Sequence, residues 1–162
     1  MKISNFTPET TQERTFNIVG KDLTFKAKVI TDFKAFEELC PTPLAPIRVT
    51  RDNVKTRNVK DPKFLEKLEA HGSARMVYMI MESLSVTEGI EWTLLDPADV
   101  ETMTEANLMQ EFGDAGIPEM IANKIIRLAT DTNGLTDTLL KDRRETFLPE
   151  EEELVEALPL PG

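Results

Sequence analysis

The pattern of apolar and polar residues is densest between residues 61 and 95. Within this stretch the apolar residues recur at roughly helical spacing and make one face of a helix: Phe64, Leu68, Met76, Met79 and Ile80. We expect a helix over 61–84, either continuous or broken at Gly72, then a turn and an extended segment over 89–95. A stretch this apolar should form the core of the protein.

A different pattern, alternation with period two, occurs near the N-terminus. Residues 23–30, LTFKAKVI, place apolar and polar side chains on opposite faces, and residues 15–19 also have the composition of a strand. Gly20-Lys21-Asp22 lies between them as a turn signal, so we expect a β-hairpin. Residues 32–39 predict a short helix capped by Asp32, with three side chains turned inward: Phe33, Phe36 and Leu39.

Residues 40–60, CPTPLAPIRVTRDNVKTRNVK, follow neither pattern. Prolines at 41, 43 and 46 oppose a helix and favour an extended path. Five basic residues follow, against the single acid Asp52: Arg48, Arg51, Lys55, Arg57 and Lys60. Three interpretations stay open, namely a mobile loop, an edge strand, and an arm that grips an acidic partner.

The C-terminal half reads as mostly helical. Asp96-Pro97-Ala98-Asp99 is typical of a helix start, and that helix should run to about Phe112. A second helix should begin at 117–119 and end at 133–134, and a third should cover 136–147. The second has an expected buried stripe: Met120, Ile121, Ile125, Leu128 and Ala129.

These elements predict an α+β fold, with an N-terminal β-hairpin or small antiparallel sheet followed by a mostly helical C-terminal half. We divide the chain into a flexible lead-in over 1–14, a single domain over 15–147, and an acidic, proline-rich tail over 148–162.

Charge narrows the class of partner. The net charge of −10 is divided unevenly, because residues 1–80 hold 14 basic and 10 acidic residues and residues 81–162 hold 5 and 19. The second half therefore has a net charge of −14, which opposes nucleic-acid binding and suits a basic partner. Five of its carboxylates gather in sequence and suggest a metal or acid–base site, but Asp96 and Asp99 are better explained as helix caps. The five are Glu88, Glu91, Asp96, Asp99 and Glu101.

Reaction chemistry is not indicated. Cys40 and His71 are the only residues of their kinds and have no partners in the sequence, and no phosphate-binding, dinucleotide-binding or hydrolase motif occurs. We expect no enzyme, no cofactor and no metal. A polar N-terminus and the lack of a long apolar run lead us to expect no membrane and a cytoplasmic location.

Five segments together carry a resemblance to a known family: DFKAFEEL, CPTPLAP, DPKFLEKL, GIEWTLLDPADVETM and AGIPEMIANKI. Over residues 15–147 the chain resembles the small tail assembly chaperones of long-tailed bacteriophages. The resemblance implies binding of the long helical tape-measure protein and assistance to the tail tube subunits that polymerise around it. It places the protein in the host cytoplasm.

Apolar, methionine-bearing positions are the candidate protein-binding residues, because methionine adapts to varied helical partners. They are Met76, Met79, Ile80, Trp92, Met103, Met109 and Met120. A homo-oligomer is also open. The alternatives are a structural subunit of a phage virion, as a tail or head–tail connector component located in the virion, and more weakly a nucleic-acid-binding regulator acting through residues 48–60.

Overall fold

The computed structural model describes residues 14–17 and 24–134, so the expected helix over 136–147 and the tail over 148–162 lie outside the described residues. The described elements are, in order, β1 (Arg14–Asn17), β2 (Thr24–Ala27), α1 (Lys34–Leu39), β3 (Ile47–Val49), β4 (Lys55–Arg57), α2 (Pro62–Leu84), a 3₁₀ turn η2 (Val100–Thr102), α3 (Glu105–Asp114) and α4 (Glu119–Thr132). The fold is α+β, as the sequence predicts.

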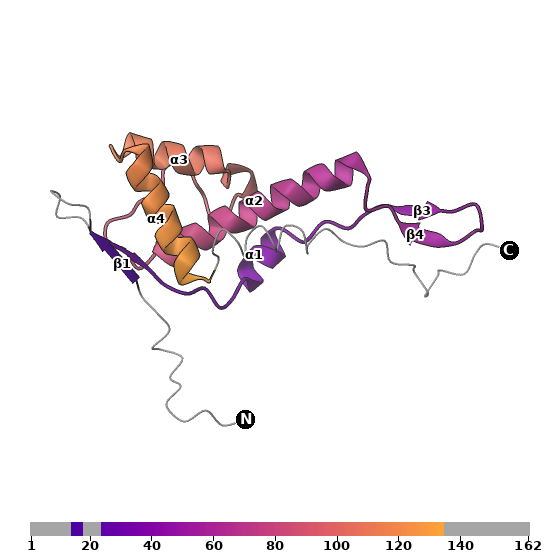
Figure 1. The fold of residues 1–162 in the computed structure, drawn as a ribbon, viewed down its shortest axis with the longest axis horizontal. Coiled ribbons are helices and arrows are strands. Elements are labelled where there is room, and N and C mark those ends of the chain that lie inside the picture. The colour runs from indigo at the N-terminus through magenta and orange to yellow at the C-terminus, as the bar shows by residue number, and fades with distance from the viewer. Residues whose placement is uncertain (1–13, 18–23, 135–162) are drawn as a thin grey trace, which may run out of the picture.

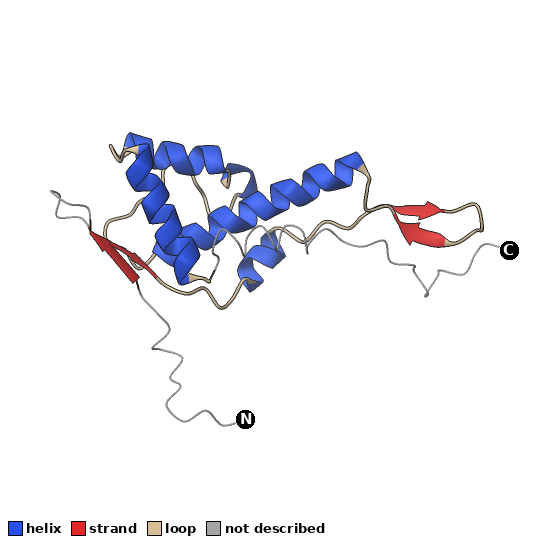
Figure 2. Ribbon diagram, in the orientation of Figure 1, coloured by secondary structure: helices blue, strands red, loops and turns tan. Residues whose placement is uncertain are grey.

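Helix α2 forms the long axis of the molecule. Figure 1 shows β1–β2, α3 and α4 gathered around its C-terminal half, while β3 and β4 project beyond its N-terminal end. The two β-hairpins of the described chain therefore lie at opposite ends, with helices between them (Figure 2).

Helix α2 runs without a break for 23 residues, so of the two alternatives left open by the sequence the continuous helix is the one that forms. The helix begins where the sequence indicates: the Asp61 carboxylate accepts a hydrogen bond from the Phe64 N–H at 2.9 Å, and Pro62 occupies the first turn. A glycine inside a helix weakens it by only about 1 kcal/mol, which packing of the other turns offsets. Residues 77–81 are all buried, whereas most of the first half is not.

The N-terminal hairpin is confirmed, with Phe16 opposite Phe25 in antiparallel register. It is fastened to the end of α2 by paired hydrogen bonds. The Lys28 N–H donates to the Ser83 carbonyl at 2.9 Å, and the Ser83 hydroxyl donates back to the Lys28 carbonyl at 2.7 Å. This fastening places the buried faces of β2 and α2 in one core.

Helix α1 forms as expected, but its details differ. Phe36 is fully buried and Phe33 half-buried beneath the Arg75 guanidinium, whereas Leu39 is exposed and does not turn inward. The Asp32 carboxylate accepts from the Lys34 N–H at 2.8 Å, although the residue at the helix boundary is Phe33.

Helix α3 begins later than the sequence suggests. Residues 96–99 form a turn and Asp99 caps the short η2, so the Asp-Pro sequence does not start α3. Helix α3 instead begins after Thr104, whose hydroxyl accepts a hydrogen bond from the Asn107 N–H at 3.1 Å. Helix α4 begins and ends as expected. Met120 is exposed, so its expected place in the buried stripe of this helix is wrong.

Candidate interaction surfaces

The segment between α2 and α3 is held by one carboxylate. Oε1 of Glu111 accepts hydrogen bonds from the backbone N–H groups of Thr93 at 2.7 Å, Leu94, and Leu95 at 3.0 Å. The Thr93 hydroxyl donates to the other oxygen at 3.1 Å. Residues 93–95 therefore bend around a buried side chain, and residues 89–95, expected to be extended, form an irregular segment.

These contacts also set the protonation of Glu111. Burial by itself raises the pKa of this carboxyl, but the hydrogen bonds from Leu95, Leu94 and Thr93 outweigh it and hold the pKa below its usual value. A carboxylate that accepts four hydrogen bonds has little capacity left for substrate. Glu111 therefore positions the backbone.

Trp92 directly precedes the three residues whose backbone N–H groups bind Glu111. Its ring meets that of Phe112 edge-on, with centroids 6.4 Å apart and planes at 82°. The side chain is only half-buried, and its aromatic neighbour comes from α3. Trp92 therefore packs against α3 and stays partly exposed.

The seven candidate binding residues do not form one surface. Met79, Ile80 and Met103 are buried in the core, so they cannot contact a partner in the folded protein. Met76, Trp92 and Met109 are partly buried and pack against that core. Met120 alone among the seven is exposed, at 72%.

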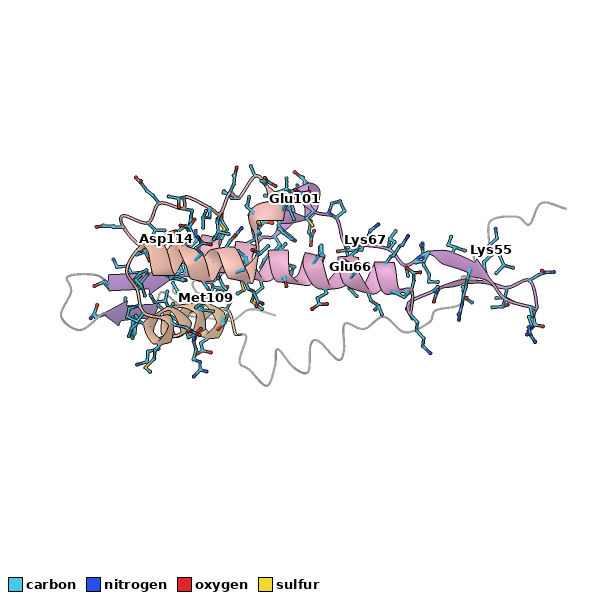
Figure 3. All side chains as sticks on the ribbon, turned by 90° about the horizontal axis from the view of Figure 1, so that it is seen from above. Lys55, Glu66, Lys67, Glu101, Met109 and Asp114 are labelled. Carbon is cyan, nitrogen blue, oxygen red and sulfur yellow. The ribbon has the colours of Figure 1, made fainter. Side chains whose placement is uncertain are left out.

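A depression lies where α3 meets α4. Its volume is about 390 Å³ and its lining comes from both helices and the turn between them: Met109, Gln110, Gly113, Ile117, Glu119 and Ala122. Figure 3 shows Met109 on this side of the molecule. Of the seven candidates only Met109 lines the depression, whereas Met120 lies on the outward face of α4.

The outward stripe of α4 continues from Met120. Lys124 and Arg127 follow at helical spacing and are also exposed. They are the only basic residues between positions 76 and 134. Helix α4 therefore presents an apolar side chain and two cations in a row.

The outward stripe of α4 and the depression beside α3 are the first candidate surface. The second is the β3–β4 hairpin with its flanks, residues 44–60, which we call the arm. Ile47 pairs with Arg57 and Val49 with Lys55 in an antiparallel register. The Asn53 backbone adopts a left-handed conformation at the turn, with φ of 60°, and the Thr50 N–H donates to the Val54 carbonyl at 2.9 Å. The segment is thus an ordered hairpin that projects from the body, as Figure 1 shows, in place of a loop.

One face of the arm is both apolar and basic. Directly opposed residues of an antiparallel pair share a face, which places Ile47 and Val49 beside Arg57 and Lys55. Ile47 is 47% and Val49 57% exposed, and Leu44 at the base of the arm is 74% exposed. Three of the four most exposed large apolar side chains in the described residues therefore belong to the arm, the fourth being Met120.

The third surface is acidic. Residues 88–114, which we call the acidic segment, contain eight carboxylates and no Lys or Arg. All except Glu111 are exposed: Glu88, Glu91, Asp96, Asp99, Glu101, Glu105 and Asp114. Asp96 and Asp99 accept backbone hydrogen bonds from Ala98 and Glu101, as local caps do. Within the described chain no three His, Cys, Asp or Glu side chains are arranged to hold a metal ion.

The fold brings together Cys40 and His71, which the sequence separates. His71 Nε2 lies 3.2 Å from the Cys40 carbonyl oxygen, and the imidazole packs against Phe36 with centroids 5.5 Å apart. Burial lowers the pKa of His71 and raises the pKa of the Cys40 thiol. The contact is to the carbonyl oxygen of Cys40, and it fastens α1 to the middle of α2.

None of the helices that the structure describes combines the length and the apolar character needed to cross a membrane. A comparison of the chain with protein-family models, curated proteins and solved structures finds no match. The interpretation of function therefore rests on the three surfaces above.

Proposed function

We propose that this protein is a non-catalytic tail assembly chaperone that binds amphipathic helices of an elongated partner, the tape-measure protein of a long-tailed bacteriophage. The observation that carries the proposal is the 72% exposure of Met120, which shares the outward face of α4 with the exposed residues Lys124 and Arg127. An exposed methionine with two cations along one face of a helix suits contact with an amphipathic helix that carries an acidic flank.

The chemistry of this surface suits a helix better than a rigid ligand. Methionine is unbranched and flexible, so Met120 and Met109 can adjust to different apolar side chains along a long partner. Apolar burial contributes about 25 cal/mol per Å² and supplies most of the affinity. Lys124 and Arg127 add about 0–1 kcal/mol each as exposed charges, and they orient helices that carry an acidic flank.

The chaperone role follows from this binding mode. By covering the apolar stripe of the tape-measure helices, the protein keeps that partner soluble until the tail tube subunits polymerise around it. Its own net charge of −10 keeps the complex dispersed in the host cytoplasm.

Co-purification with the product of the next gene downstream tests the proposal. We expect that product to be a long helical protein and to be retained by the full chain. Met120→Glu should weaken the retention at least tenfold, because it places a carboxylate in the apolar contact. Leu65→Glu, which changes a partly exposed apolar residue on α2, is the matched control and should bind as the original chain does.

The proposal fails if the downstream product is neither long nor helical, or if it does not bind. It also fails if the two variants weaken retention equally, since the surface on α4 would then have no special role. Circular dichroism of both variants verifies that each is folded.

The arm favours a second candidate, a structural subunit of the virion as a tail or head–tail connector component. A projecting hairpin with exposed apolar side chains suits contacts between subunits of an assembly. Mass spectrometry of purified particles separates the two functions, because a chaperone is lost from the mature virion and a subunit is retained in stoichiometric amount.

A further inference from the structure

We propose that the arm is a docking element for a second copy of this chain, and that it docks on the acidic segment of that copy. The proposal concerns a different surface from the one on α4 and does not depend on the chaperone function.

The apolar side chains of the arm indicate that something covers it. Ile47 and Val49 lie on a two-stranded ribbon, and the exposed Leu44 lies just before it at the base of the arm. In the described chain each strand of this ribbon has only one neighbouring strand. Exposed strand edges with apolar side chains are sites where other chains bind.

Charge identifies the occupant. Residues 44–60 hold five basic residues and one acid, so the arm has a charge of +4, and the acidic segment has a charge of −8. The apolar pair Ile47 and Val49 shares its face with Lys55 and Arg57. A partner must therefore offer carboxylates around an apolar contact, and the acidic segment does so, because Leu94 is 36% exposed among its acids.

The geometry directs this contact to another molecule. Lys55 on the arm lies at one extremity of the molecule, whereas Asp114 lies over the body toward the other (Figure 3). The two surfaces differ from one another, so the contact is heterologous. A pair of copies joined by one such contact retains one unused arm and one unused acidic segment, so association continues into a ring or a chain.

Sedimentation velocity of the full chain tests for association. We expect oligomers whose size rises with protein concentration at about 0.1 M salt. Raising the salt to about 1 M shortens the Debye length from about 10 Å to about 3 Å, which should reduce the oligomers without abolishing them, because the apolar contact persists. A chain that is monomeric at every concentration in low salt contradicts the proposal.

A complementation experiment tests the two surfaces separately. The arm variant carries Val49→Glu and Lys55→Glu, and the segment variant carries Glu101→Lys and Asp114→Lys; all four residues lie in partly or fully exposed positions. Each variant alone should be monomeric. An equimolar mixture should form a heterodimer and nothing larger, because only the intact arm of one and the intact acidic segment of the other can meet.

The control is Lys34→Glu on α1, a charge reversal outside both surfaces, which should associate as the original chain does. Circular dichroism establishes that the variants are folded. A segment variant that still dimerises by itself contradicts the proposal and indicates contact between two arms. Duplex DNA bound with a steep salt dependence, lost in the arm variant and seen without self-association, assigns the arm to nucleic acid instead.

Discussion

Asn133, the residue that ends α4, accepts a hydrogen bond from the backbone N–H of Ile30 at 2.7 Å. Its amide nitrogen lies within hydrogen-bond distance of three acceptors, the Ala129 carbonyl at 2.7 Å, the Ser83 hydroxyl at 3.1 Å and the Lys28 carbonyl at 3.3 Å. One side chain thus links the end of α4 to the end of α2 and to the segment that follows β2.

We expect Asn133→Asp to destabilise the protein more than its small change in size suggests. The variant keeps an acceptor for the Ile30 N–H but replaces the amide donor by a carboxylate oxygen that faces the Ala129 and Lys28 carbonyls. Losing a partner of a buried polar group costs about 1–3 kcal/mol, and more where a charge is introduced. Urea denaturation measures this as a lowered midpoint. An equal midpoint for both proteins contradicts the assigned role of the amide nitrogen.

Glu111→Gln should lower stability near neutral pH, because a neutral amide accepts hydrogen bonds more weakly than a carboxylate and places an NH₂ group among N–H donors. The expected loss is about 2–3 kcal/mol, as for hydrogen bonds to a charged group. Glu105→Gln, at an exposed position in the same helix, is the control and should change stability by no more than about 0.5 kcal/mol.

The Glu111 carboxylate should also make the free energy of unfolding depend on pH. The folded state holds the pKa of Glu111 below the ordinary value of 4.5, so its contribution is fully present above that value and is lost as the pH falls through the folded pKa. The original chain should therefore lose stability on acidification more steeply than Glu111→Gln does. Parallel curves of unfolding free energy against pH for the two proteins would contradict the assigned role of the Glu111 carboxylate.

Local pattern predicted the elements whose folding is local. The alternation in residues 23–30 identified β2, and helical spacing identified α2 and α4. The start of α3 could not be predicted in this way, because Asp96-Pro97 has the residues of a helix cap but is drawn into a turn closed by Thr102, whose hydroxyl donates to the Asp99 carbonyl at 2.7 Å. That contact is visible only in three dimensions.

The interaction surfaces were harder to predict than the fold. Met103 and Met120 look equivalent in the sequence, yet one is buried after the η2 turn and the other is exposed on α4, because only packing decides which side chains meet the core. The arm did have a usable signal. Asp52-Asn53 is a turn pair between two short runs rich in Val and Thr, which is typical of a hairpin. The prolines before it favour a single extended path, which is the opposite indication.

His71 provides a sharp test by NMR, since it is the only histidine in the chain. Burial is the largest influence on its pKa and opposes the charged form, so the imidazole should titrate below the ordinary value of 6.5. The unfolded state then binds more protons just below that pH, and stability should decline as the pH falls through 6.5. A titration midpoint above 6.5 contradicts the packing of His71 against Phe36.

Trp92 should report a half-buried environment. We expect an emission maximum between those of a fully buried and a fully hydrated indole, and partial quenching by acrylamide. Trp92→Ala should cost about 2 kcal/mol, roughly half of the 3–5 kcal/mol typical of a fully buried aromatic residue. Phe112→Leu should shift the emission to longer wavelength by removing the edge-on ring. An emission unchanged by that substitution would contradict the pairing.

Two glycine-to-alanine substitutions should change the stability of the protein in opposite directions. Gly72 lies inside the continuous helix α2, is exposed, and has no atom within 4 Å of the position a Cβ would occupy. Gly72→Ala should therefore stabilise the protein by about 0.5–1 kcal/mol, because alanine loses less backbone freedom on folding. Gly116 has equal space but a φ of +77°, which a residue with a Cβ adopts at a cost of about 1–2 kcal/mol. Gly116→Ala should accordingly destabilise the protein. Thermal unfolding of the two variants measures both effects, and a destabilising Gly72→Ala would indicate that α2 is interrupted at that residue after all.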